Sequence, residues 1–100
     1  MRPTDRIAVD SYVFDALMPD LVAHDRRPAA FLVYLHLWRK TRGGARGVVL
    51  SLSMMTDATG LSKRSVQTAL QHLERRALVT TRRTTPTSAP TVTLHAHWRK

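Results

Sequence analysis

Cysteine is absent from this sequence of 100 residues. Disulfide bonds and thiolate metal sites are therefore excluded, and the composition is compatible with an intracellular setting. The N-terminal sequence MRPTDRIAVDS lacks the apolar run of a signal peptide. The longest apolar run, residues 29–38, covers ten residues, whereas a bilayer span needs about 20. We therefore expect a cytoplasmic protein without a membrane segment.

The sequence also lacks the usual signatures of an enzyme. The glycine-containing segment GGARG at residues 43–47 has no P-loop lysine and follows a predicted helix, not a strand. No serine, histidine and aspartate stand in a recognisable catalytic order. His95 and His97 would lie on one side of a strand, but a closed zinc site would need ligands from distant parts of the chain. We expect no enzyme activity, no cofactor and no metal.

Acidic residues are scarce in most of the chain. Residues 1–25 contain two arginines and five aspartates, a net charge of −3, whereas residues 26–100 contain 14 basic and two acidic residues, a net charge of +12. Together they give the chain its net charge of +9. Such an uneven field favours a polyanion as partner. The alternative is a basic surface that only keeps the protein soluble.

The length is enough for one domain with a modest core. We predict a domain at residues 26–100. Residues 1–25 are rich in apolar side chains, so we expect them to pack on that domain as an N-terminal extension. The aspartates of the extension either lie against the basic body, form an arm for a partner, or face solvent.

The elements within the extension are less regular in pattern. Ile7 and Val9 alternate with polar residues like a short strand. Asp10 or Ser11 can cap a following helix, which Pro19 either ends or continues as another turn.

Residues 28–42 are predicted to form the first long helix. Pro28 suits a first helical turn, and Gly43 with Gly44 ends the helix. Its apolar side chains cover most of the circumference: Phe31, Leu32, Tyr34, Leu35, Leu37 and Trp38. A helix of this kind is buried on two sides. One side faces the core, and the other meets either the N-terminal segment or a second subunit, so a homodimer through this helix or the N-terminal segment is one prediction.

A short strand and a short helix follow. Residues 48–50 are predicted to form a buried strand, after which Ser51 caps a helix of about two turns. Leu52 and Met55 point inward in this helix. Gly60 can take the left-handed conformation that the next turn needs, and Leu61 fills the corner between this helix and the next.

The helix predicted at residues 63–76 begins with a conflict. Ser62 is a good N-cap, yet Lys63 and Arg64 follow it at the positive end of the helix dipole, where cations are disfavoured. Ser65 stands where a glutamate would complete a capping box. A phosphate at this helix end would resolve the conflict, because the free N–H groups and both cations would face an anion.

The same helix separates its faces. The inner stripe is Val66, Ala69, Leu70 and Leu73, and the outer set is Lys63, Arg64, Gln67, Thr68, Gln71 and Arg75. The outer set carries guanidinium, amide and hydroxyl donors and no carboxylate. Arginine reads guanine edges and glutamine reads adenine edges, so this face suits a DNA major groove. The alternative is an ordinary solvated helix face.

A hairpin is predicted at the C-terminal end. Residues 78–83 form one strand and residues 91–98 its antiparallel partner, in which apolar and polar side chains alternate. The long tip between them is rich in threonine, serine and proline. Arg82 and Arg83 stand at its base, where they can follow phosphates or enter a minor groove. The alternative is an edge strand protected from aggregation by its charge.

The order of these elements and the segment TGLSKRSVQTALQHLERRALV at residues 59–79 resemble winged helix-turn-helix domains. The pattern T-G-L-S-x-R-T-V-x-x-A-L-x-x-L-x-x-x-G-L-[IV] is found in bacterial regulators and in the N-terminal domains of some phage and plasmid replication proteins. Ser65 replaces the threonine, Ala77 replaces the glycine at the helix stop, and Thr56 stands where a small alanine is usual. The resemblance implies an α+β fold, mostly helical, with a three-helix core and a small antiparallel β wing.

The resemblance further implies double-stranded DNA as partner and transcriptional regulation as role, with the DNA-bound protein on the nucleoid. By position it implies Ser62, Lys63 and Ser65 on phosphates, Arg64, Gln67 and Thr68 at base edges, Gln71 at the margin, and Arg82 and Arg83 in the wing. One alternative is the origin-recognition part of a replication initiator. Another is a winged-helix module that docks a protein and has lost DNA binding.

Overall fold

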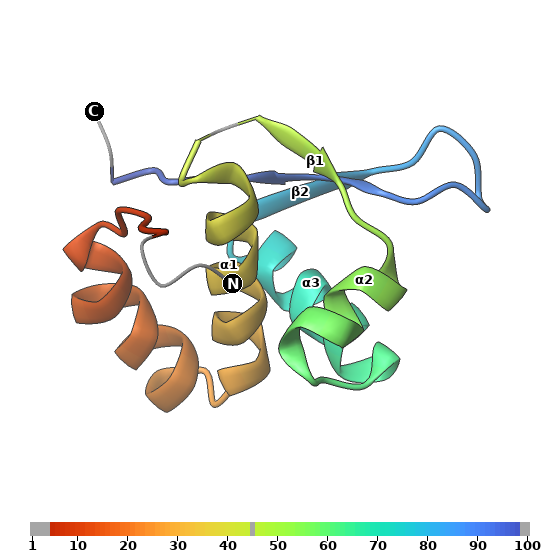
Figure 1. The fold of residues 1–100 in the computed structure, drawn as a ribbon. Helices are drawn as coiled ribbons and strands as arrows, with labels where there is room; N and C mark the ends of the chain where they lie inside the picture. The colour runs from red at the N-terminus through yellow and green to blue at the C-terminus, as the bar shows by residue number, and fades with distance from the viewer. Residues whose placement is uncertain (1–4, 45, 99–100) are drawn as a thin grey trace.

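The computed structural model describes residues 5–44 and 46–98. In chain order the elements are the π-helices η1 (Val13–Leu17) and η2 (Pro19–His24), α1 (Pro28–Thr41), β1 (Gly47–Val49), α2 (Leu52–Thr59), α3 (Lys63–Arg75), β2 (Val79–Arg82) and β3 (Thr91–Leu94). Helix α1 stands between the N-terminal helices on one side and α2 and α3 on the other, and the β2–β3 hairpin extends past α2 (Figure 1). The predicted fold class, mostly helical with a small antiparallel sheet, is confirmed.

The sheet has three antiparallel strands in the order β1-β3-β2. Its inner face is apolar, since Val92 and Leu94 of β3 are fully or almost fully buried. The predicted burial of the whole 48–50 strand is wrong, because Val49 is 61% exposed on the edge strand β1 and Leu50 is buried only after the strand has ended.

Strand β3 also ends earlier than predicted, at Leu94 and not near Trp98. Its partner β2 begins at Val79, which lies opposite Leu94. Just before β2 the chain leaves α3 through Ala77, whose backbone is left-handed with φ 59°. The His95 N–H donates to the Leu78 carbonyl. Before Leu78 the chain turns back into α3, so it offers no extended backbone that could pair with the residues after His95.

The strand predicted at Ile7 and Val9 is wrong, since residues 5–10 form no regular element. This stretch is instead held by the Trp38 indole N–H, which donates to the Ala8 carbonyl at 2.8 Å. The predicted helix after Ser11 is present and continues through Pro19, which starts η2. Its widened turns use i→i+5 hydrogen bonds, as in the bond from the Asp25 N–H to the Asp20 carbonyl at 2.8 Å.

The core joins the N-terminal helices to the rest of the chain. Val13, Leu17 and Leu21 are buried in the same cluster as Leu37 and Trp38 of α1. Helix α1 is therefore buried on two sides, as predicted, and its second side meets the N-terminal segment of its own chain. Not every apolar side chain of α1 is buried: Leu37 is fully buried, whereas Leu32 is 45% exposed.

Candidate nucleic-acid interface

The turn between α2 and α3 is built from local hydrogen bonds. Ser51 caps α2 as predicted, since its Oγ accepts the Met54 N–H at 3.1 Å. Gly60 ends the helix with φ 76°, the left-handed conformation expected of it. The Leu61 N–H then donates to the Thr59 hydroxyl at 3.2 Å, and Leu61 packs against the core. This turn sets the direction in which α3 leaves α2.

Helix α3 begins with the predicted cap and keeps the predicted conflict. The Ser62 Oγ accepts the Ser65 N–H at 3.1 Å and donates to the Ser65 hydroxyl at 3.0 Å. No acidic residue lies in the first turn. Lys63 and Arg64 are exposed, and within the described residues neither has an ion-pair partner. The helix end therefore presents cations and backbone donors to solvent, an arrangement that suits an anion.

The faces of α3 are separated as predicted. The inner stripe of Val66, Ala69, Leu70 and Leu73 is buried. Of the ten predicted site residues, Ser65 and Thr68 are half-buried and the other eight are exposed: Ser62, Lys63, Arg64, Gln67, Gln71, Arg75, Arg82 and Arg83. Successive residues turn by about 100° around a helix. Arg64, Gln71 and Arg75 consequently point directly away from the core, with Gln67 and Thr68 on either side of them.

The hairpin lies along one flank of α3. A groove of about 300 Å³ is lined by Gln67 and Gln71 of α3, by Arg83 of the hairpin and by neighbouring residues. Glu74 also lines this groove and accepts a hydrogen bond from the Thr81 hydroxyl. Arg82, the last residue of β2, pairs with Thr91 and is exposed. The structure thus brings Arg83 next to the flank of α3 that faces the hairpin.

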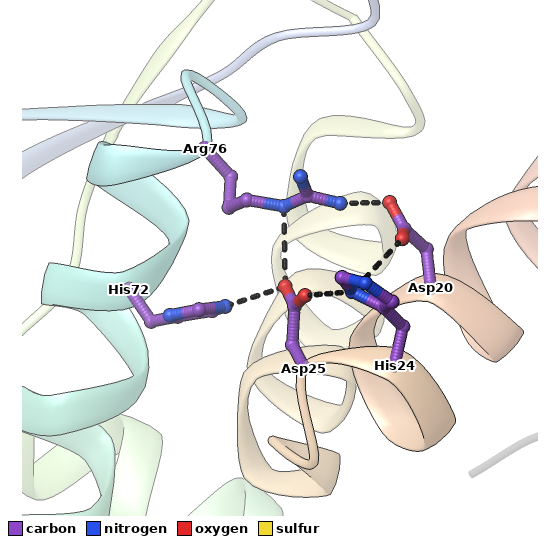
Figure 2. A network of polar contacts seen from close by, with 5 residues as sticks. All are labelled: Asp20, His24, Asp25, His72 and Arg76. Atoms are coloured by element: carbon purple, nitrogen blue, oxygen red, sulfur yellow. Dashed lines mark hydrogen bonds and ion pairs between the residues drawn. The ribbon is translucent and has the colours of Figure 1, made fainter.

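The opposite flank of α3 is tied to the N-terminal helices, a contact that the sequence left open. The His72 ring nitrogen Nε2 lies 2.7 Å from a carboxylate oxygen of Asp25, and the Arg76 Nε lies 3.1 Å from the same carboxylate. Arg76 also pairs with Asp20 (Figure 2). Hydrogen bonds from His24 and His72 lower the pKa of Asp25. The acidic extension therefore does lie against the basic body, at the C-terminal end of α3.

Two groups of possible metal ligands have other partners. Ligand atoms of Asp20, His24 and Asp25 lie within 4.8 Å of one another, but the Arg76 guanidinium occupies the same cluster and already supplies a cation. His95 and His97 stack with ring centroids 5.8 Å apart. His95 bonds the Thr80 hydroxyl at 2.7 Å, and His97 bonds the Ala77 carbonyl. The histidine pair thus has a structural part in holding the hairpin.

Comparison with known proteins agrees with this geometry. A family model described as a helix-turn-helix domain matches residues 27–79, from the start of α1 to the first residue of β2. The chain belongs to the helix-turn-helix domain family. Membership implies DNA binding, and the antiparallel sheet after α3 makes this member a winged helix-turn-helix domain. No curated protein and no solved structure matches the chain.

Over the described residues, none of the helices has the length and apolar character needed to cross a membrane.

Proposed function

We propose that this helix-turn-helix protein is a transcriptional regulator that binds a specific double-stranded DNA sequence in the cytoplasm, on the nucleoid. The observation that carries the proposal is the outer face of α3. It presents exposed guanidinium, amide and ammonium donors, and its first-turn cations have no ion-pair partner among the described residues. Donors of these types match base edges and phosphates in a major groove.

The proposed contacts follow the position of each side chain. Arg64, Gln67 and Thr68 read base edges, with Gln71 at the margin of the recognised sequence. The remaining site residues contact the DNA backbone: Ser62, Lys63, Ser65, Arg75, Arg82 and Arg83. Phosphate contacts position the protein, and base contacts select the sequence.

A fluorescence-anisotropy titration with random duplex DNA at low salt tests the proposal. We expect micromolar binding that the double variant Arg64→Ala/Gln67→Ala weakens. With about five phosphate contacts, log K falls with log salt at a slope of about −4 to −5. A wild-type slope near zero contradicts the proposal.

Arg64→Ala separates base reading from backbone contact. If Arg64 reads a base, a sequence found by site selection loses about 1–3 kcal/mol of binding free energy and sequence choice relaxes, while random duplex is affected less. Equal losses on selected and random duplexes assign Arg64 to a phosphate. The selected sequence also decides between a promoter operator and the alternative, the repeats of a replication origin.

Protein docking is the competing function, and several exposed large apolar side chains favour it. Leu32 of α1 is 45% exposed, and Tyr12, Phe14 and Met18 of the extension are 41–43% exposed. Such side chains are candidates for a partner or for a homodimer. Leu37, the other apolar residue that widens the apolar face of α1, is fully buried, so its substitution would only report on folding. Leu32→Glu tests this surface: loss of a dimer mass in sedimentation, with DNA binding retained, would support it.

A further inference from the structure

A second group of arginines lies on the flank of α3 that faces away from the hairpin. Arg26 and Arg27 precede α1 and line a groove of about 260 Å³ together with Arg64, Ser65 and Thr68 of α3. No acidic residue lines this groove. Three arginines thus line one groove, and two of them come from a segment outside α3 and the hairpin.

The hairpin and this groove are on different sides of the exposed face of α3. Gln67 and Glu74 line the groove on the hairpin side, whereas Ser65 and Thr68 line the arginine groove. With about 100° between successive residues, the outermost positions of the helix fall between these two flanks. A duplex that received α3 in its major groove would therefore have one flank beside the hairpin and the other beside Arg26 and Arg27.

The segment that carries these arginines is held in place from both sides. Asp25 is bound by His72 of α3 and by Arg76, the residue that follows the helix (Figure 2). The Arg27 N–H donates to the Leu21 carbonyl at 2.8 Å. Arg26 has φ 55°, a left-handed conformation that costs a non-glycine residue roughly 1–2 kcal/mol. Because this backbone is already ordered next to α3, binding through it costs less backbone entropy than binding through a flexible segment would.

Their charges are available for a ligand. Arg26 and Arg27 are exposed, and neither takes part in an ion pair within residues 5–44 and 46–98. The nearest carboxylate along the chain, Asp25, is already paired with His72 and Arg76. Arginine binds phosphate oxygens through two parallel N–H groups, so a pair of free guanidinium groups beside a DNA-reading helix suits two backbone phosphates.

We propose that Arg26 and Arg27 are a second phosphate-binding site, which grips the DNA backbone on the side of the major groove opposite the wing. This inference rests on the proposed function of α3. The major groove is about 12 Å wide, and clamping both of its edges fixes the rotation of α3 within it. The arginine pair contributes affinity and register, and Arg64 connects it to the base-reading face.

The test compares two double variants with equal loss of charge. Arg26→Gln/Arg27→Gln removes the proposed site. Arg39→Gln/Arg42→Gln is the matched control at the far end of α1, where Arg42 has φ 54° and so carries the same left-handed backbone as Arg26. Both variants and wild type are titrated into random duplex DNA by fluorescence anisotropy across a salt series, and thermal melting checks that each is folded.

The expected result is a loss of affinity of about tenfold or more at low salt for Arg26→Gln/Arg27→Gln, with the salt slope reduced in magnitude by about 2. The control keeps a slope within about 0.5 of wild type. Equal losses of affinity and of salt slope in the two variants would overturn the inference, because the effect would then come from net charge alone. If wild type binds and Arg64→Ala/Gln67→Ala weakens binding while Arg26→Gln/Arg27→Gln does not, the inference fails and the proposed function stands. A wild type without salt-dependent binding overturns both.

Discussion

Single residues with unusual backbone or charge carry several properties of this fold. Ala77 stands where winged helices of this type carry glycine, and its φ of 59° is the left-handed conformation that glycine adopts without strain. The β-carbon makes this conformation costly by roughly 1–2 kcal/mol. The short turn needs it nonetheless, because the Leu78 N–H must return to the Leu73 carbonyl before β2 begins.

Ala77→Gly should therefore stabilise the protein. We expect a gain of about 1 kcal/mol in the free energy of unfolding, because the relief of strain exceeds the added entropy of the unfolded chain. For a domain of this size the gain corresponds to a rise of roughly 4–8 °C in melting temperature. Ala58→Gly in α2 is the control and should lower the melting temperature, since helical backbone favours alanine. A fall in melting temperature for Ala77→Gly would contradict the assignment of strain.

Asp25 makes stability depend on pH. Hydrogen bonds from His24 and His72 hold its pKa below the ordinary value of 3.8. A carboxylate whose folded-state pKa is lowered stabilises the fold above its unfolded-state pKa, and that stabilisation is lost as the pH falls through the folded-state pKa. We expect the free energy of unfolding of wild type to exceed that of Asp25→Asn at neutral pH. This difference should shrink below about pH 4 and vanish at lower pH.

Urea unfolding at neutral and acidic pH measures this difference. Asp57→Asn, at an exposed position of α2, is the control and should track wild type at both pH values. If the difference in free energy of unfolding between wild type and Asp25→Asn stays unchanged across the acid range, the lowered pKa of Asp25 does not contribute to stability.

At the scale of elements, the hairpin has a charged base and an uncharged tip. Arg82 and Arg83 stand at the base of the hairpin, whereas residues 84–90 are uncharged. The tip is organised by its own hydrogen bonds, with Thr85 and Ser88 each donating a backbone N–H to the other's hydroxyl at 3.1 Å. Salt dependence should therefore follow the base of the hairpin and not its tip.

Two hairpin variants test whether the salt dependence of binding comes from the base of the hairpin or from its tip. Arg82→Gln/Arg83→Gln should reduce the magnitude of the salt slope by about 2. Replacing residues 84–89 by Asn-Gly, which favours a tight hairpin turn, should leave the slope unchanged and keep the melting temperature, because the Arg82–Thr91 pairing stays. A smaller slope after shortening of the tip would contradict the expectation that only the base contributes to the salt dependence.

At the scale of the whole molecule, the N-terminal helices are part of the core. Val13 and Leu21 are fully buried and Leu17 nearly so. Burying each of these side chains contributes about 1.5–3 kcal/mol, while a whole domain is stable by only about 5–15 kcal/mol. The aspartates of the same helices bind α3 and hold the segment before α1.

Residues 26–100 alone should therefore fold poorly. We expect circular dichroism of this fragment to show a broad transition at a much lower temperature than the full chain. Adding residues 11–25 back should restore a cooperative melt. A fragment that melted like the full chain would show that residues 1–25 are a dispensable extension on an independent domain.

Local chemistry in the sequence was sufficient to predict the helix-turn-helix. The caps Ser51 and Ser62, the left-handed Gly60 and the apolar spacing of α3 act between residues a few positions apart. Interactions of this range depend on residues close together in the chain, so the buried and exposed faces of α3 were predicted correctly. The hairpin was predicted for the same reason, apart from the point where β3 ends.

Contacts between distant residues were decided only by the tertiary structure. Asp25 and His72 are 47 positions apart, and no periodicity in the sequence pairs them. The same holds for Trp38 and Ala8, whose hydrogen bond replaces the strand expected at Ile7 and Val9, and for the exposure of Val49 on an edge strand. In the sequence, nothing distinguishes Arg26 and Arg27 from the other basic residues. Only the tertiary packing places them beside Arg64. Their position depends on where α1 lies against α3, and that is fixed by the sum of many weak apolar contacts and not by any local motif.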